Sequence, residues 1–104
     1  MSWKIVTLPK AARDFLGIMD YLAGFYPSTP RNFAQAYYKT LDRLKDRPYA
    51  WSVYYGNPLY RRAIVGKKYL VFYIVDEEAH EVQIHRILRG SLDILRILQD
   101  EPQP

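Results

Sequence analysis

The sequence contains no cysteine and only two histidines, His80 and His85, among its 104 residues. The absence of cysteine excludes a disulfide framework, a thiolate nucleophile and thiolate ligands for a metal. Two histidines are too few for a histidine-rich metal cluster, and the acidic residues show no spacing typical of a metal site. We therefore expect neither a bound metal nor a cofactor.

Long apolar runs are also missing. No run approaches the ~20 residues that a membrane-spanning helix requires. Residues 1–10 lack the continuous apolar segment of a signal peptide, so we expect a cytoplasmic protein that does not contact a membrane. The length and the apolar content of 49% suit one domain over residues 1–104, in which residues 98–104 form a loose tail.

Positive charge is in moderate excess. Fifteen Lys and Arg residues against eleven Asp and Glu residues give a formal net charge of +4. This balance favours an acidic partner, either a nucleic acid or an acidic peptide, but many unrelated proteins share it. Charge alone therefore does not select a function.

The first half of the chain reads as a short strand followed by two helices. Residues 3–8 are short and rich in β-branched side chains, which favours a strand. Residues 10–26 then show the apolar spacing of one helix face, which Pro27 ends. The next helix is predicted to begin with Thr29 as its N-cap and Pro30 as its first residue.

The second half reads as three strands and a short helix. Strands are predicted over residues 60–65, 68–75 and 81–88, and their short links favour an antiparallel meander. Ser91 is expected to cap a last helix over residues 92–98. The chain contains no internal repeat and no linker that would divide it.

These elements predict an α+β fold in the order β-α-α-β-β-β-(α). Its helical hairpin packs on a mainly antiparallel sheet as a two-layer sandwich. The strand at residues 68–75 is apolar on both sides, as is typical of a central strand covered on both faces. The hairpin covers only one face, so the other needs the terminal helix, a loop or another chain.

Four segments in order carry a resemblance to a known family. They are AARDFLGIMDYLAGFYP, RNFAQAYYKTLDRLKDRP, YRRAIVGKKYLVFYIVD and VQIHRILRGSLDI. Together they make the chain, from about residue 3 to residue 94, resemble the RelE/ParE superfamily of bacterial type II toxins, also called plasmid stabilization proteins. No single segment is as specific as a zinc motif, but their order and separation leave few other interpretations.

The resemblance implies a growth-inhibiting toxin that is paired with a ParD/RelB-like antitoxin encoded beside it. RelE-like members cut messenger RNA on the ribosome without a metal. ParE-like members inhibit DNA gyrase and have no known catalytic centre of their own. Both branches share the fold predicted above, so individual residues must decide between them.

Three parts expected of a RelE-like nuclease are missing here. Leu70 stands where those members have an arginine in the third strand, and Gly90 stands at or beside their last-strand arginine. No tyrosine or histidine follows Gly90. These departures favour the ParE side and inhibition by binding. A ribosome-dependent endoribonuclease and a decayed toxin kept as an antitoxin-binding module remain the alternatives.

His85 is the one candidate for a catalytic residue. It stands where the family usually has an aliphatic side chain, and an imidazole is the usual proton shuttle near neutral pH. The alternative is a histidine partly buried between strand neighbours, and we favour it. His80 lies in an acidic turn and is expected at the surface.

Arg86 has two interpretations. An arginine among apolar strand residues is costly to bury unless it is paired. Its structural interpretation is an ion pair with a helix carboxylate such as Asp14 or Asp20. Its functional interpretation is a bidentate contact to an acidic partner or a nucleic acid.

The other candidate binding residues are five cations near the strand ends: Arg61, Arg62, Lys67, Lys68 and Arg89. Each one alone suits a solvated rim. As a set they suit a continuous binding surface for an acidic segment. Such a surface would speed association more than it would add affinity.

Ten tyrosines are many for this length, and several gather with a tryptophan over residues 49–60. Aromatic side chains are favoured at interfaces, where one end of the ring is apolar and the other is wet. Packing of a core beneath a long loop is the alternative. The sequence leaves both open.

Overall fold

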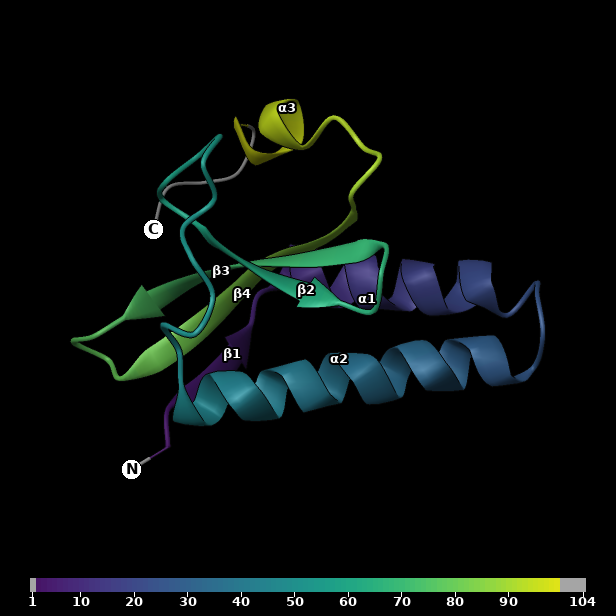
Figure 1. Cartoon of the computed structure of the whole chain (residues 1–104), viewed down its shortest axis with the longest axis horizontal. Helices are drawn as coiled ribbons and strands as arrows, with labels where there is room; N and C mark the ends of the chain where they lie inside the picture. Colours follow the sequence, from purple (N-terminus) through teal and green to yellow (C-terminus); the bar gives the residue numbers. More distant parts are fainter. Residues whose placement is uncertain (1, 100–104) are drawn as a thin grey trace.

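Four strands form one mixed sheet in the spatial order β1–β4–β3–β2. The computed structural model, which describes residues 2–99, pairs β1 with β4 in parallel and the other neighbours antiparallel (Figure 1). The strands are β1 (Lys4–Thr7), β2 (Arg61–Val65), β3 (Tyr69–Asp76) and β4 (Glu81–Arg89). The predicted antiparallel meander is therefore β2–β3–β4, and the first strand joins it at the far edge.

Two long helices cover one face of this sheet, and a short one lies on the other (Figure 1). They are α1 (Pro9–Leu22), α2 (Ser28–Asp46) and α3 (Ile94–Gln99). The element order β-α-α-β-β-β-α confirms the predicted α+β fold. Pro9 begins α1 because the first helical position needs no backbone N–H donor.

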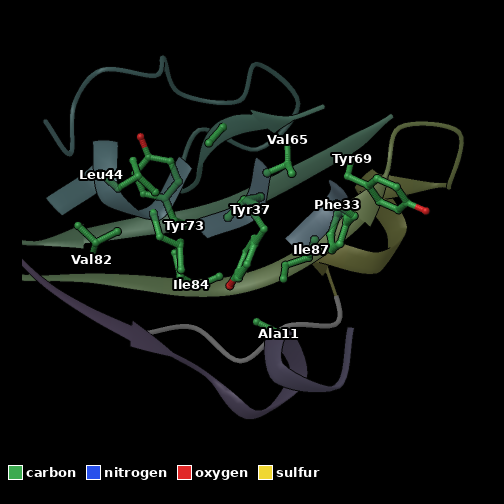
Figure 2. Packing of buried hydrophobic residues seen from close by; sticks show 13 residues of the cluster. Ala11, Phe33, Tyr37, Leu44, Val65, Tyr69, Tyr73, Val82, Ile84 and Ile87 are labelled. Atoms are coloured by element: carbon green, nitrogen blue, oxygen red, sulfur yellow. The ribbon is translucent and has the colours of Figure 1, made fainter. Parts of the chain in front are cut away.

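The main core lies between the sheet and the hairpin of α1 and α2. Figure 2 shows its aromatic and aliphatic side chains meeting from both layers. From α2, Phe33, Tyr37, Leu41 and Leu44 recur at helical spacing and are all buried. Alternate residues of β3 face them, as the two-residue period of a strand requires.

A second core lies on the opposite face of the sheet. Phe72 and Leu88 are buried there beneath Ile94 and Leu98 of α3, together with Tyr60 from the loop before β2. This arrangement explains why β3 is apolar on both sides. Of the covers expected for that face, the terminal helix and a loop both contribute.

The ends of the two long helices differ from the prediction. Instead of continuing to residue 26, α1 stops at Leu22, where the N–H groups of Gly24 and Phe25 close tight turns. Tyr26 therefore leaves the predicted apolar stripe. Thr29 does not cap α2, because its own N–H already bonds to Tyr26 and draws the helix start back to Ser28.

The last helix also begins later than predicted. It runs over Ile94–Gln99, and the carbonyl of Asp93 accepts its first hydrogen bond, from Ile97, so Ser91 is not the cap. Leu98 is fully buried in the second core, which corrects the predicted start of the loose tail. Residues 100–104 of that predicted tail lie outside the described residues.

Gly17 lies inside α1, although no neighbouring group in this chain requires a residue without a side chain at that position. A Cβ placed there would meet no atom within 4 Å. Because alanine restricts the unfolded chain and suits a helix, Gly17→Ala is expected to raise the free energy of unfolding by about 0.5–1 kcal/mol. Urea denaturation measures this change. Gly66→Ala is the opposite control, since Gly66 has a φ of +62° and an alanine there should destabilise the turn.

Candidate functional site: a basic groove with an aromatic floor

The candidate cations fall into two groups at opposite ends of β2. Lys67 and Lys68 occupy the β2–β3 turn, and Arg89 joins them because it pairs with Tyr69 at the start of β3. Arg61 and Arg62 begin β2, so roughly 13 Å of strand separates them from the turn. The five cations therefore do not form one continuous binding surface.

The turn group borders an open groove, which we call the main groove. It has a volume of about 430 Å³ and lies between the end of the α1–α2 hairpin and the β2–β3 turn. Among the described residues, Lys67, Lys68 and Arg89 are its charged lining residues, and no carboxylate from residues 2–99 lines it. Its apolar lining comes from both layers: Leu22, Phe33, Ala36, Val65 and Tyr69, with three rings from α1 and the loop that follows it.

Those three rings are Tyr21, Phe25 and Tyr26, and they are exposed by 51%, 57% and 78%. Tyr21 and Phe25 pack edge to face, with ring centroids 5.3 Å apart. Covering these two rings would remove on the order of 200 Å² of surface, a gross gain of about 5 kcal/mol before ordering costs. An exposed aromatic patch with a basic border is the usual form of an interaction site.

Arg89 stands at one side of the main groove. Its guanidinium carbon lies 5.6 Å from the centroid of the Tyr21 ring, within cation–π range. Within residues 2–99, no carboxylate pairs with Arg89, Lys67 or Lys68. These cations are therefore available to an acidic group from another molecule.

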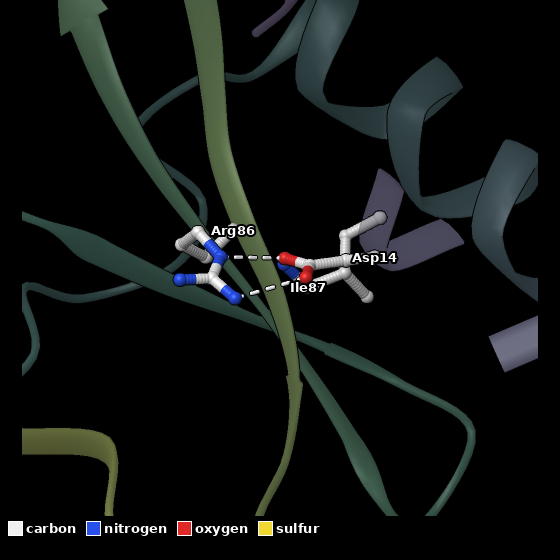
Figure 3. A network of polar contacts seen from close by, with 3 residues as sticks. All are labelled: Asp14, Arg86 and Ile87. Atoms are coloured by element: carbon white, nitrogen blue, oxygen red, sulfur yellow. Dashed lines mark hydrogen bonds and ion pairs between the residues drawn. The ribbon is translucent and has the colours of Figure 1, made fainter. Parts of the chain in front are cut away.

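Arg86 is held by Asp14 on α1 (Figure 3). Its Nε and Nη2 donate to the two carboxylate oxygens at 2.7 and 2.9 Å, and the side chains are only 18% and 14% exposed. The same carboxylate accepts the backbone N–H of Ile87 at 2.9 Å. Of the two interpretations of Arg86, the structure contains the ion pair, and with Asp14 as the partner.

The position of Asp14 follows from the sheet. β1 pairs with β4 only as far as the Thr7–Ile84 pair, so the edge of β4 beyond that point has no strand beside it. At this edge the Asp14 carboxylate, and not the carbonyl of a neighbouring strand, accepts the hydrogen bond from the N–H of Ile87. The register between β3 and β4 also shifts here, and His85 is the extra residue of this bulge.

His85 is buried, with an exposed fraction of 4%. Its ring meets that of Tyr60 edge to face, with centroids 5.3 Å apart, beneath the second core. A bulge re-aims a side chain, which places the imidazole on this apolar face. The predicted buried histidine is thus confirmed, and His80 is exposed in its turn, also as predicted.

Arg61 and Arg62 contact nearby aromatic residues. Arg61 donates to the carbonyl of Trp51 at 2.7 Å and lies 4.8 Å from the Tyr49 ring centroid. Arg62 is exposed and lies 5.8 Å from the Tyr54 ring centroid. Both help to hold the loop before β2 against the sheet. Arg61 is partly buried, so it is not the freely solvated rim residue that the sequence suggested.

Tyr73 ties the same loop to the main core. Its hydroxyl donates to the carbonyl of Pro48 at 2.8 Å, and burial raises its pKa to about 12. An unfolded tyrosine loses its proton near pH 10, so the stability that the protonated phenol provides is complete below that pH. As the pH rises from about 10 to 12, up to about 2–3 kcal/mol should be lost.

Urea denaturation at several pH values tests this dependence, with Tyr73→Phe as the control. Phenylalanine has no phenol to titrate, so the variant should lose less stability over that interval. Equal losses in both proteins would show that Tyr73 is not the group responsible.

The sequence did not single out the main groove. Its three exposed rings come from a segment that was interpreted as helix face, whereas α1 ends before Phe25 and Tyr26. The Gly24 that follows α1 was the available signal for that end. In the tyrosine-rich loop, Tyr60 is buried, as the core-packing interpretation predicts, whereas Tyr55 is 98% exposed.

The described residues also bear on metal binding and on membrane spanning. Within residues 2–99, no group of three or more His, Asp or Glu side chains is placed to hold a metal ion. In the same part of the chain, no helix has the length and apolar character needed to cross a membrane.

Solved structures of toxins have the same fold. "Chromosomal ParDE TA system from P. aeruginosa" matches with a TM-score of 0.71 and 20% identity, over 85% of this chain and 96% of that one. The complex RelBE2 from Mycobacterium tuberculosis matches at 0.62 and 16%, over 86% and 99%. A mutant of E. coli toxin RelE in the free state matches at 0.64 and 12%, over 97% and 100%. The architecture is thus that of RelE/ParE toxins.

The family comparison is more specific. Residues 5–94 match the family described as ParE toxin of type II toxin-antitoxin system, parDE. The chain therefore belongs to the ParE toxin family, and it is a type II toxin. A search of curated proteins finds no significant match.

Proposed function

We propose that this toxin halts growth by binding an essential target, DNA gyrase, and that a cognate antitoxin neutralises it by docking in the main groove. Membership of the ParE family supports the target. The groove supports the antitoxin, because its exposed rings and unpaired cations suit an amphipathic acidic segment. The complexes ParDE and RelBE2 among the similar structures also support such a partner.

The burial of His85 is the observation that carries inhibition by binding. A general acid or base must come within hydrogen-bond reach of the group that it serves. The His85 side chain is 4% exposed and packs against the ring of Tyr60, which belongs to the second core, so a phosphate in solution does not reach it. Arg86, the neighbouring cation, is already engaged by Asp14.

Induction of the toxin in cells tests this proposal. Plasmid topology and the 5′ ends of cellular RNA are measured from the same culture. The proposal predicts growth arrest with loss of negative supercoiling and with transcripts intact. Cleaved transcripts that disappear in His85→Ala would instead favour the endoribonuclease.

A third outcome separates the remaining alternative. If induction does not slow growth while the chain still binds the antitoxin encoded beside it, the protein is a binding module and the proposed inhibition is wrong. Co-purification of the two gene products measures that binding.

A further inference from the structure

A second hollow continues the main groove along α1. This side hollow has a volume of about 410 Å³, and its α1 lining includes Arg13, Asp14 and Gly17. Tyr21, Tyr69 and Arg89 line both spaces. The two spaces therefore share one wall and can accept a single segment that crosses it.

The shared wall contains the contact between Tyr21 and Arg89. The Tyr21 ring contacts one face of the Arg89 guanidinium and helps to position it. The N–H donors of the guanidinium remain available to an acceptor. Within residues 2–99, no carboxylate forms an ion pair with Arg89. A carboxylate on the crossing segment would supply one.

The charge of the molecule is concentrated along this path. Within residues 2–99, five of the fifteen Lys and Arg residues line the two hollows, but only one of the nine Asp and Glu residues does so. Outside the two linings, this part of the chain contains ten Lys and Arg residues and eight Asp and Glu residues, so four of its six net positive charges belong to the linings. The one carboxylate is Asp14, which is engaged by Arg86 and the N–H of Ile87.

Gly17 gives an independent reason to expect a ligand in the side hollow. A glycine inside a helix is less favourable than alanine, yet a Cβ at this position would touch nothing in this chain. The space above Gly17 is part of the hollow lining. A side chain from another molecule can enter there only while the position stays small.

We propose that the antitoxin segment occupies both hollows, with an apolar side chain in each and an acidic residue between them at Arg89. The identity of this partner rests on the proposed function. Gly17 lines only the side hollow and Leu22 lines only the main groove, and the five residues of α1 between them correspond to roughly 7.5 Å. The two apolar anchors are therefore roughly five residues apart in a helical segment, or two in an extended one.

Peptide selection on the purified full chain tests this inference. A random library of roughly 12-residue peptides is long enough for either spacing. Selected peptides are expected to contain two apolar positions with Asp or Glu between them. Selection on Arg89→Glu should lose this acidic preference, and Arg31→Glu, with the same charge change outside both hollows, should retain it. An unchanged preference on Arg89→Glu, or no selected peptides at all, would overturn the inference.

Gly17→Leu provides a second test, which does not depend on how Arg89→Glu folds. Leucine should fill the side hollow and weaken the two-anchor peptides by about tenfold or more, whereas peptides cut back to the main-groove anchor should bind as before. If the two-anchor peptides bind Gly17→Leu as tightly as they bind the unchanged chain, the two-hollow site is wrong. Neither test uses gyrase, so failure of the proposed target and failure of this docking site are distinguishable.

Discussion

Asp14→Ala is expected to destabilise the fold by about 3–5 kcal/mol, because it removes one partner of a largely buried ion pair. The substitution leaves the Arg86 guanidinium without this carboxylate and the N–H of Ile87 without its acceptor. Both groups lie where β4 has β3 on one side but no longer has β1 on the other, so this edge of the sheet should open first. Urea denaturation followed by circular dichroism measures the change.

Asp20→Ala is the matched control for this prediction. It removes a carboxylate from the same helix, but Asp20 is exposed, so a change within about 0.5 kcal/mol is expected. The double variant Asp14→Ala with Arg86→Ala should cost clearly less than the sum of the two single changes. Strict additivity would mean that the ion pair does not couple the two residues.

Phe72→Ala should cost about 3–5 kcal/mol, because it empties a fully buried ring site in the second core. The Phe72 ring meets that of Tyr54 at 5.2 Å between centroids and belongs to the cluster that holds Ile94 and Leu98 of α3. Loss of this side chain should loosen α3 and the loop before β2 together. Denaturation measures the stability, and amide hydrogen exchange measures the loosening of α3.

Ile64→Ala is the control for this second prediction. Ile64 belongs to the same sheet but is 42% exposed, so its truncation should cost much less than that of Phe72. If hydrogen exchange in α3 rises no more in Phe72→Ala than in Ile64→Ala, the second core does not hold this helix.

The element order could be predicted because local patterns carry it. The apolar stripe of α2 has helical spacing, and the two-sided apolar pattern of β3 indicated that both faces of the sheet are covered. Proline and capping signals were less informative about boundaries. Thr29 and Pro30 look like a helix start, but the hydrogen bond from the N–H of Thr29 to Tyr26 begins the helix earlier.

The candidate site was predictable only in part. Arg86 could be assigned a helix carboxylate because a guanidinium among apolar neighbours needs one, and Asp14 is that partner. The split of the five cations was harder to foresee, since it depends on which strand ends meet across the sheet. The main groove depends on where α1 stops, which brings Phe25 and Tyr26 next to the β2–β3 turn.

The most direct test of inhibition by binding uses the purified toxin in two reactions side by side. One contains gyrase and relaxed plasmid, and the other contains translating ribosomes and messenger RNA. We predict that supercoiling falls as toxin is added and that the messenger RNA remains intact. Cut messenger RNA with unimpaired supercoiling would contradict the account.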